Sequence, residues 1–155
     1  MWEGVPDGTT DPVATLSVFA PEGMSSDGTY LTVSTPAARP RRSEVFLVDE
    51  IAALGSSASD IAGDANLPVG ALAAAGHLFA ADVNNSQVLV WEDIADALAG
   101  LSADAILGAS GPTDTRPEIS RNQVFWPAVV SFDGSYLWVG EVKFSGRLVR
   151  FSPTG

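Results

Sequence analysis

Six of the eight lysine and arginine residues lie in three polar segments, residues 35–43, 109–124 and 142–146, although the 155-residue chain has a formal net charge of −11. The guanidinium group of arginine presents a planar fork of hydrogen-bond donors that matches carboxylate and phosphate groups. If these segments lie on one surface, they predict binding of a small anionic ligand, a glycan or a peptide. Tryptophan is favoured at the centre of binding surfaces, and one lies just beyond the longest segment. The candidate binding residues are Arg39, Arg41, Arg42, Arg116, Arg121, Trp126 and Lys143.

The same basic residues have a second interpretation, as solvated loop charges that pair with acids such as Glu44, Asp114 and Glu118. Three carboxylates near these loops, Asp82, Asp114 and Glu141, are candidates for general acid, base or hard-metal ligand. Asp82 has a structural alternative, because an aspartate that ends a strand can accept hydrogen bonds from backbone amides of the next turn. No nucleophile elbow, phosphate-binding loop or dinucleotide fingerprint occurs. We therefore assign no catalytic residue and predict no cofactor.

The composition excludes several other functions. A strongly negative chain is repelled by nucleic acid and by anionic bilayers. The absence of cysteine excludes disulfides and thiolate metal sites, and with one histidine a metal site would need several carboxylates to converge. Residues 1–20 contain neither a basic start nor a sustained apolar stretch, so no signal peptide is expected, and no transmembrane span is visible. We expect a soluble chain, for which both secretion and a cytoplasmic location are open.

A pattern that recurs three times indicates how these residues are positioned. In each copy a proline begins a small or apolar run, a turn dipeptide follows, and a second apolar run begins one residue later, as in a β-hairpin. A third apolar run follows each hairpin, at residues 45–48, 88–91 and 148–151. After the first two copies come an acidic helical segment, at 49–54 and 92–98, and a short fourth run, at 59–63 and 103–108. The turn dipeptides are Asp27-Gly28, Ala75-Gly76 and Asp133-Gly134.

This order predicts an all-β fold of four-stranded antiparallel blades, three per chain, from a β-propeller. The blades cover roughly residues 20–63, 64–108 and 125–155 of a single domain, and residues 13–19 form a leading outer strand. The repeat prolines, Pro21, Pro68 and Pro127, are 47 and 59 residues apart, and residues 109–124 account for the difference as a loop insertion. A β-sandwich or meander is the alternative, because turn signals also recur at short intervals there.

The middle copy resembles the NHL repeat family, whose blades carry a proline-glycine start, a strand that ends in alanine-aspartate, paired asparagines and then arginine-valine-leucine. The residues that carry this resemblance are Pro68-Val69-Gly70, Leu78-Phe79-Ala80-Ala81-Asp82, Asn84-Asn85 and Val88-Leu89. The outer copies depart from it, because Thr35 and Glu141 replace Asp82. The resemblance implies a propeller, in a family that includes extracellular lyases with channel metal ions and modules that bind protein or RNA. His77 aligns with tyrosines in the outer copies, which indicates a surface or half-buried packing role.

Three blades are too few to close a propeller. Two copies that exchange their leading strands would close a six-bladed ring as a homodimer, and the alternative is that the chain is part of a longer propeller. We predict a binding or scaffold module that recognises a small anionic ligand, a glycan or a peptide or protein partner on its loop face. The alternative function is a lyase or hydrolase with a metal-assisted site at the central channel.

Overall fold

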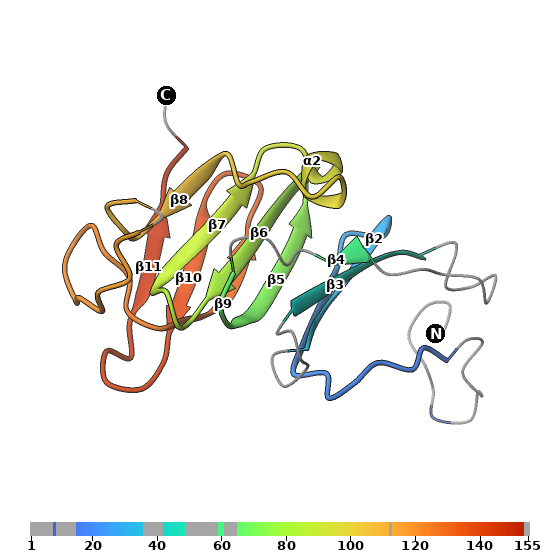
Figure 1. The fold of residues 1–155 in the computed structure, drawn as a ribbon, viewed down its shortest axis with the longest axis horizontal. Coiled ribbons are helices and arrows are strands. Elements are labelled where there is room, and N and C mark those ends of the chain that lie inside the picture. The colour runs from blue at the N-terminus through green and yellow to red at the C-terminus, as the bar shows by residue number, and fades with distance from the viewer. Residues whose placement is uncertain are drawn as a thin grey trace.

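The computed structural model describes residues 8, 15–35, 42–48, 59–60, 65–111 and 113–153, and these form three antiparallel sheets (Figure 1). Sheet 1 consists, in order, of β1 (Gly23–Ser26), β2 (Tyr30–Thr35), β3 (Arg42–Leu47) and β4 (Ser59–Asp60). Sheet 2 consists of β5 (Pro68–Ala74), β6 (His77–Asp82), β7 (Gln87–Trp91) and β8 (Ala105–Leu107). Sheet 3 contains β9 (Pro127–Phe132), β10 (Leu137–Glu141) and β11 (Leu148–Phe151). The predicted all-β fold class is confirmed, and the sheets do not close into a ring.

Local turn chemistry produces the hairpins. The Asp27 Oδ1 atom accepts hydrogen bonds from the amides of Thr29 and Tyr30, both at 2.9 Å. Asp133 makes the same pair of bonds, to the amides of Ser135 and Tyr136. The glycine after each aspartate has a φ near +97°, in the left-handed region that glycine enters without a steric penalty. The sequence therefore fixes β1–β2 and β9–β10 through residues that are close neighbours in the chain.

Sheet 2 lies between the other two sheets. The strands β1 and β2 contact β5, and β5 and β6 contact β9. Neighbouring side chains of a strand point to opposite faces, so β6 contributes residues to an apolar cluster on each face of sheet 2. Leu78 and Ala80 pack toward Val45 of sheet 1, and Phe79 packs toward Leu137 and Val139 of sheet 3. Apolar layers thus cover both faces of sheet 2.

One backbone contact is repeated between successive sheets. A Cβ atom added to Gly23 would lie 2.8 Å from the Val69 carbonyl oxygen, and one added to Gly70 would lie 2.5 Å from that of Ala128. In the alignment of the copies, Gly70 corresponds to Gly23 and Ala128 to Val69. Sheet 2 therefore approaches sheet 3 in the same way as sheet 1 approaches sheet 2, and both approaches require glycine.

The acidic segment after β7 forms the short helix α2 (Ile94–Leu98), as its spacing predicts. The Asp93 side chain caps this helix by accepting a hydrogen bond from the Ala95 amide at 2.8 Å. Ile94 and Ala97 are buried against sheet 2. Among the described residues, no helix is long and apolar enough to cross a membrane.

Two features differ from the expected blades. Residues 15–19 of the predicted leading strand belong to no strand, and residues 13–14 lie outside the described residues. Leu16 and Val18 instead pack against Val33 and Phe46 of their own chain, where the apolar outer face of sheet 1 attracts them. Sheet 3 has three strands in the described part of the chain, so the position that β4 and β8 occupy in sheets 1 and 2 has no counterpart there.

Candidate binding surfaces

The structure brings together two of the predicted binding residues, Trp126 and Lys143. The Lys143 Nζ atom lies 3.2 Å from the centre of the Trp126 ring, which is a cation–π contact. The Phe125 ring stacks on Trp126 with a centroid distance of 5.7 Å, and the Phe144 ring lies 6.5 Å from Phe125. Phe144 is 84% exposed. These four residues, Phe125, Trp126, Lys143 and Phe144, are called the aromatic cluster below.

The backbone of the aromatic cluster is strained. Trp126 has a φ of +48° and Lys143 a φ of +61°, values in the left-handed region that residues with a Cβ atom rarely adopt. The Val142 amide donates a hydrogen bond to the Trp126 carbonyl at 3.1 Å, which joins the insertion to the β10–β11 loop. Strain of this kind persists where surrounding structure enforces it and is concentrated at functional sites.

Two substitutions at Lys143 separate the strain from the cation–π contact. Lys143→Ala removes the cation and keeps a Cβ atom in the left-handed region, whereas Lys143→Gly removes both. We expect the glycine variant to be more stable than the alanine variant by about 1 kcal/mol, the cost of the left-handed conformation. Urea denaturation followed by circular dichroism measures the difference. Equal stabilities would contradict the strain assigned to this residue.

Glu141 is held by an ion pair in which the carboxylate is buried and the arginine side chain, that of Arg147, is 30% exposed, next to Phe125 of the aromatic cluster. The Glu141 side chain has 0% exposure, and its carboxylate accepts hydrogen bonds from the Arg147 Nη2 and Nε atoms at 2.6 and 2.8 Å. The Phe125 amide donates a third bond at 2.9 Å. Arg147 also donates to the carbonyls of Ser120 and Gln123, at 2.7 and 3.0 Å. Glu141 and Arg147 therefore fasten the insertion to sheet 3 and support the aromatic cluster.

The ion pair makes the stability pH-dependent. Burial raises the pKa of Glu141, but the hydrogen bonds from Arg147 and the Phe125 amide outweigh it, and the pKa lies below its ordinary value. The folded chain thus binds fewer protons than the unfolded chain between the lowered pKa and the unfolded value of about 4.3. Stability from this group is complete above that value and is lost as the pH falls through the lowered pKa.

We expect Glu141→Gln to remove this contribution. The difference in the free energy of unfolding between wild type and Glu141→Gln should shrink as the pH falls below about 4.3, because Glu141 of the unfolded wild-type chain then binds a proton, whereas the folded chain binds it only at the lowered pKa. Denaturation at a series of pH values measures it. A difference that does not change with pH would show that Glu141 has the same pKa in both states.

Asp82 occupies in sheet 2 the position that Glu141 occupies in sheet 3. It is fully buried and accepts hydrogen bonds from the amides of Asn66 and Leu67, at 2.9 and 2.8 Å, and from Asn85 Nδ2 at 2.6 Å. These contacts correspond to the structural role considered for Asp82 in the sequence, because its carboxylate accepts hydrogen bonds from the two residues that precede β5. Gln87, which pairs with Asp82 in the sheet register, stands where Arg147 stands in sheet 3.

Of the other predicted binding residues, the structure describes the side chains of Arg116 and Arg121. Arg116 forms an ion pair with Asp114 at 3.0 Å, and its side chain is 85% exposed. The hydrogen bond from Arg116 lowers the pKa of Asp114, and the same bond raises that of Arg116. Arg121 is exposed. Arg39, Arg41 and the side chain of Arg42 lie outside the described residues.

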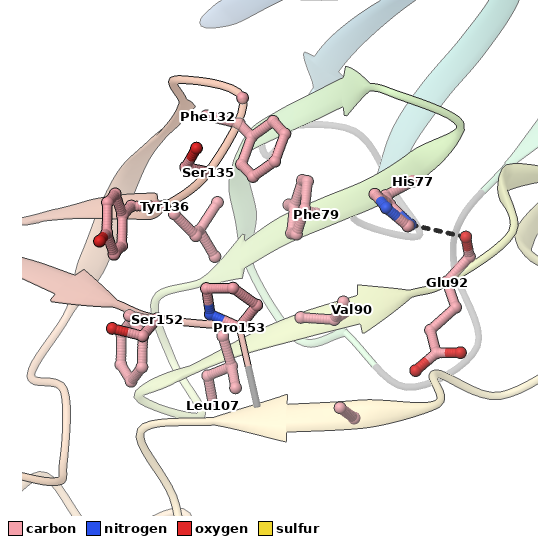
Figure 2. A pocket seen from close by; sticks show the side chains of 14 residues that line it. His77, Phe79, Val90, Glu92, Leu107, Phe132, Ser135, Tyr136, Ser152 and Pro153 are labelled. Carbon is pink, nitrogen blue, oxygen red and sulfur yellow. Dashed lines mark hydrogen bonds between the residues drawn. The ribbon is translucent and has the colours of Figure 1, made fainter. Parts of the chain in front are cut away.

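A cleft between sheets 2 and 3 was not predicted from the sequence. It has a volume of about 850 Å³ (Figure 2). Phe79 and Phe132 stack across it with a centroid distance of 5.7 Å. The half-buried His77 lies at its rim, where its Nδ1 atom is 2.6 Å from the Glu92 carbonyl oxygen. The remaining lining residues are Val90, Ala105, Leu107, Gly134, Ser135, Tyr136, Leu137, Phe151, Ser152 and Pro153.

Within the described ranges, no three histidine or carboxylate side chains gather to form a potential metal site. No protein-family model matches the chain, and no curated protein matches it in sequence.

Proposed function

We propose that this chain is a binding module that recognises a peptide segment of a partner protein through the aromatic cluster. The observation that supports this most strongly is the exposed Phe144 ring beside Trp126 and Lys143, on a backbone held in a strained conformation by the buried Glu141–Arg147 pair. Aromatic side chains on rigid supports dominate the energetics of binding surfaces. A rigid support also lowers the entropy lost on binding.

The chemistry of the cluster selects a particular kind of peptide. Phe144 and the stacked pair Phe125 and Trp126 offer apolar area to an apolar or aromatic side chain. Lys143 is exposed at the same place and favours a carboxylate on the partner. By contrast, Arg116 is already neutralised by Asp114, so a small anionic ligand held by loop arginines is less well supported.

A displayed library of random peptides tests this function. Peptides are selected on the wild-type chain and then assayed on Lys143→Glu/Phe144→Ser, which removes the apolar ring and reverses the charge. Arg121→Glu/Ile119→Ser is the matched control, because Ile119 is also exposed, at 51%. We expect peptides with an apolar and an acidic residue that lose binding only to the first variant. Loss of binding to the control variant alone would place the site on the arginines and overturn the proposal.

For the architecture, we propose successive blades of a propeller of the NHL type. The repeated contacts of Gly23 and Gly70 support this arrangement. A homodimeric ring meets an obstacle at Val129, which is 60% exposed and aligns with these two glycines. Sheets 1 and 2, and sheets 2 and 3, approach each other closely at a glycine. The Cβ atom of Val129 prevents a further sheet from approaching sheet 3 as closely, so a ring of two copies needs a wider separation at this junction. Light scattering after size exclusion distinguishes a dimer from a monomer.

A further inference from the structure

The position of a fourth strand in sheet 3, which no described residue occupies, adjoins β11, whose Phe151 lines the cleft. We infer that the free edge of β11 accepts an extended strand of a partner polypeptide, which pairs antiparallel with β11 and inserts a large apolar side chain into the cleft. This position is filled by β4 in sheet 1 and by β8 in sheet 2, whereas no strand among the described residues fills it in sheet 3. The site is separate from the aromatic cluster.

The register of the other sheets defines how the strand would pair. In sheet 2, Val90 lies opposite Ala105 and Leu89 lies opposite Ile106. The corresponding residues of β11 are Arg150 and Val149, because β10 pairs with β11 as β6 pairs with β7. An incoming strand therefore has one residue opposite Arg150 and the next opposite Val149.

The backbone of β11 has hydrogen-bonding groups that point toward this strand. The Glu141 amide donates to the Arg147 carbonyl at 2.9 Å, so by the alternation of an antiparallel ladder the backbone groups of Leu148 and Arg150 point away from β10. At the equivalent place in sheet 2, the Val90 carbonyl accepts a hydrogen bond from the Asp104 amide at 2.9 Å. Added strands gain their affinity from such main-chain bonds.

The cleft receives the side chain opposite Val149. In sheet 2 the equivalent residue, Ile106, points toward sheet 1 and packs on the core between those two sheets. A side chain at the equivalent position of sheet 3 would point toward sheet 2. There it would meet Val90 and Leu107, which line the cleft together with Phe151. A cavity of about 150 Å³ holds a benzene ring, and the cleft volume of about 850 Å³ exceeds this. The stacked rings of Phe79 and Phe132 also line this space (Figure 2). We therefore assign a large apolar residue, such as phenylalanine, to this position.

The positive charge of Arg150 indicates which kind of residue the incoming strand has opposite it. This arginine is exposed, and its guanidinium group lies 4.4 Å from the centre of the Tyr136 ring and 5.7 Å from that of Trp138. An acidic side chain directly opposite it forms a favourable cross-strand pair. Asp133, whose charge interacts with Arg150, and Glu92, which lines the cleft, disfavour further acids in the strand. The occupant is thus an extended segment of a partner protein with an acid followed directly by a large apolar residue.

A peptide based on β8 provides the probe. It has the sequence of residues 102–108 with Asp104→Asn, Ala105→Glu and Ile106→Phe, carries a fluorophore, and is titrated with the 155-residue chain while anisotropy is recorded. We expect saturable binding, weakened at least about tenfold when aspartate replaces the phenylalanine, because a charge would then be buried. Methylation of a peptide amide that faces β11 should weaken binding as well, because it removes a hydrogen bond between the two strands.

Charge reversal on the protein tests the register. Arg150→Glu should weaken binding of this peptide about fivefold, and a peptide with lysine in place of its glutamate should recover that loss. Arg121→Glu is the control with the same change of charge, and it should leave binding unchanged. Absence of saturable binding, or binding that responds equally to Arg150→Glu and Arg121→Glu, would overturn the inference. A dimer of the chain that this peptide dissociates would also overturn it, because the occupant would then be a second copy. None of these results depends on Lys143 or Phe144, on which the test of the proposed function rests. A negative result at β11 therefore leaves the proposed function untouched.

Discussion

Arg147→Ala is expected to lower the free energy of unfolding by about 3 kcal/mol, which is typical of breaking a buried ion pair from one side. In the wild type the Glu141 side chain is fully covered, and the substitution leaves its carboxylate with the hydrogen bond from the Phe125 amide. It also removes the bonds from Arg147 to the carbonyls of Ser120 and Gln123. Chemical denaturation followed by circular dichroism measures the loss. The insertion should also become easier to cleave by proteases, because Arg147 fastens it to sheet 3.

Two further variants establish that the loss comes from the buried pair. Glu141→Gln/Arg147→Ala should be more stable than the sum of the single variants predicts, because no buried charge is then left without its partner. Arg116→Ala removes an arginine from an ion pair whose arginine side chain is 85% exposed, and pairs exposed to solvent contribute little to stability. If Arg116→Ala and Arg147→Ala destabilise the chain equally, the role assigned to Arg147 is wrong.

The sequence predicted the features of this chain that depend on neighbouring residues. Asp27 and Asp133 form the same turn within three residues of themselves, and such local chemistry is visible in any sequence. The helix at 94–98 was also predicted, because its spacing and its acidic cap are local signals. The leading strand at 13–19 was not reproduced in residues 15–19, because Leu16 and Val18 gain more from covering the face of sheet 1 than from pairing at an edge.

The candidate sites could be predicted only in part, because they depend on distant residues. Trp126 and Lys143 were both singled out from the sequence, and the structure places them in contact. Arg147 was not, although it holds residues 24 and 27 positions away in the chain. The cleft has no sequence signal of its own, since it depends on how sheets 2 and 3 pack and on the absence of a fourth strand from the described part of sheet 3.

Gly70→Ala is expected to destabilise the chain by about 1–3 kcal/mol, the cost of forcing an extra carbon into a packed interior. The new Cβ atom would lie 2.5 Å from the Ala128 carbonyl oxygen and 3.6 Å from the Val129 Cα atom. These are backbone atoms of β9, so the clash can be relieved only by moving sheet 3 away from sheet 2. The movement would disturb the stacking of Phe79 on Phe132, and the loss of stability is measured by thermal or urea denaturation.

Gly140→Ala is the matched control, because Gly140 also lies in a strand and a Cβ atom there would meet its nearest neighbours at 3.5 to 3.8 Å, which is ordinary contact. Replacing a glycine by alanine where it fits stabilises a protein by about 0.4–1 kcal/mol, because the unfolded chain loses freedom. We therefore expect opposite signs at the two positions. Gly23→Ala should destabilise like Gly70→Ala, because its Cβ atom would lie 2.8 Å from the Val69 carbonyl oxygen. If both substitutions are neutral, the sheets can separate freely, and the repeated approach that supports the propeller arrangement carries no energetic weight.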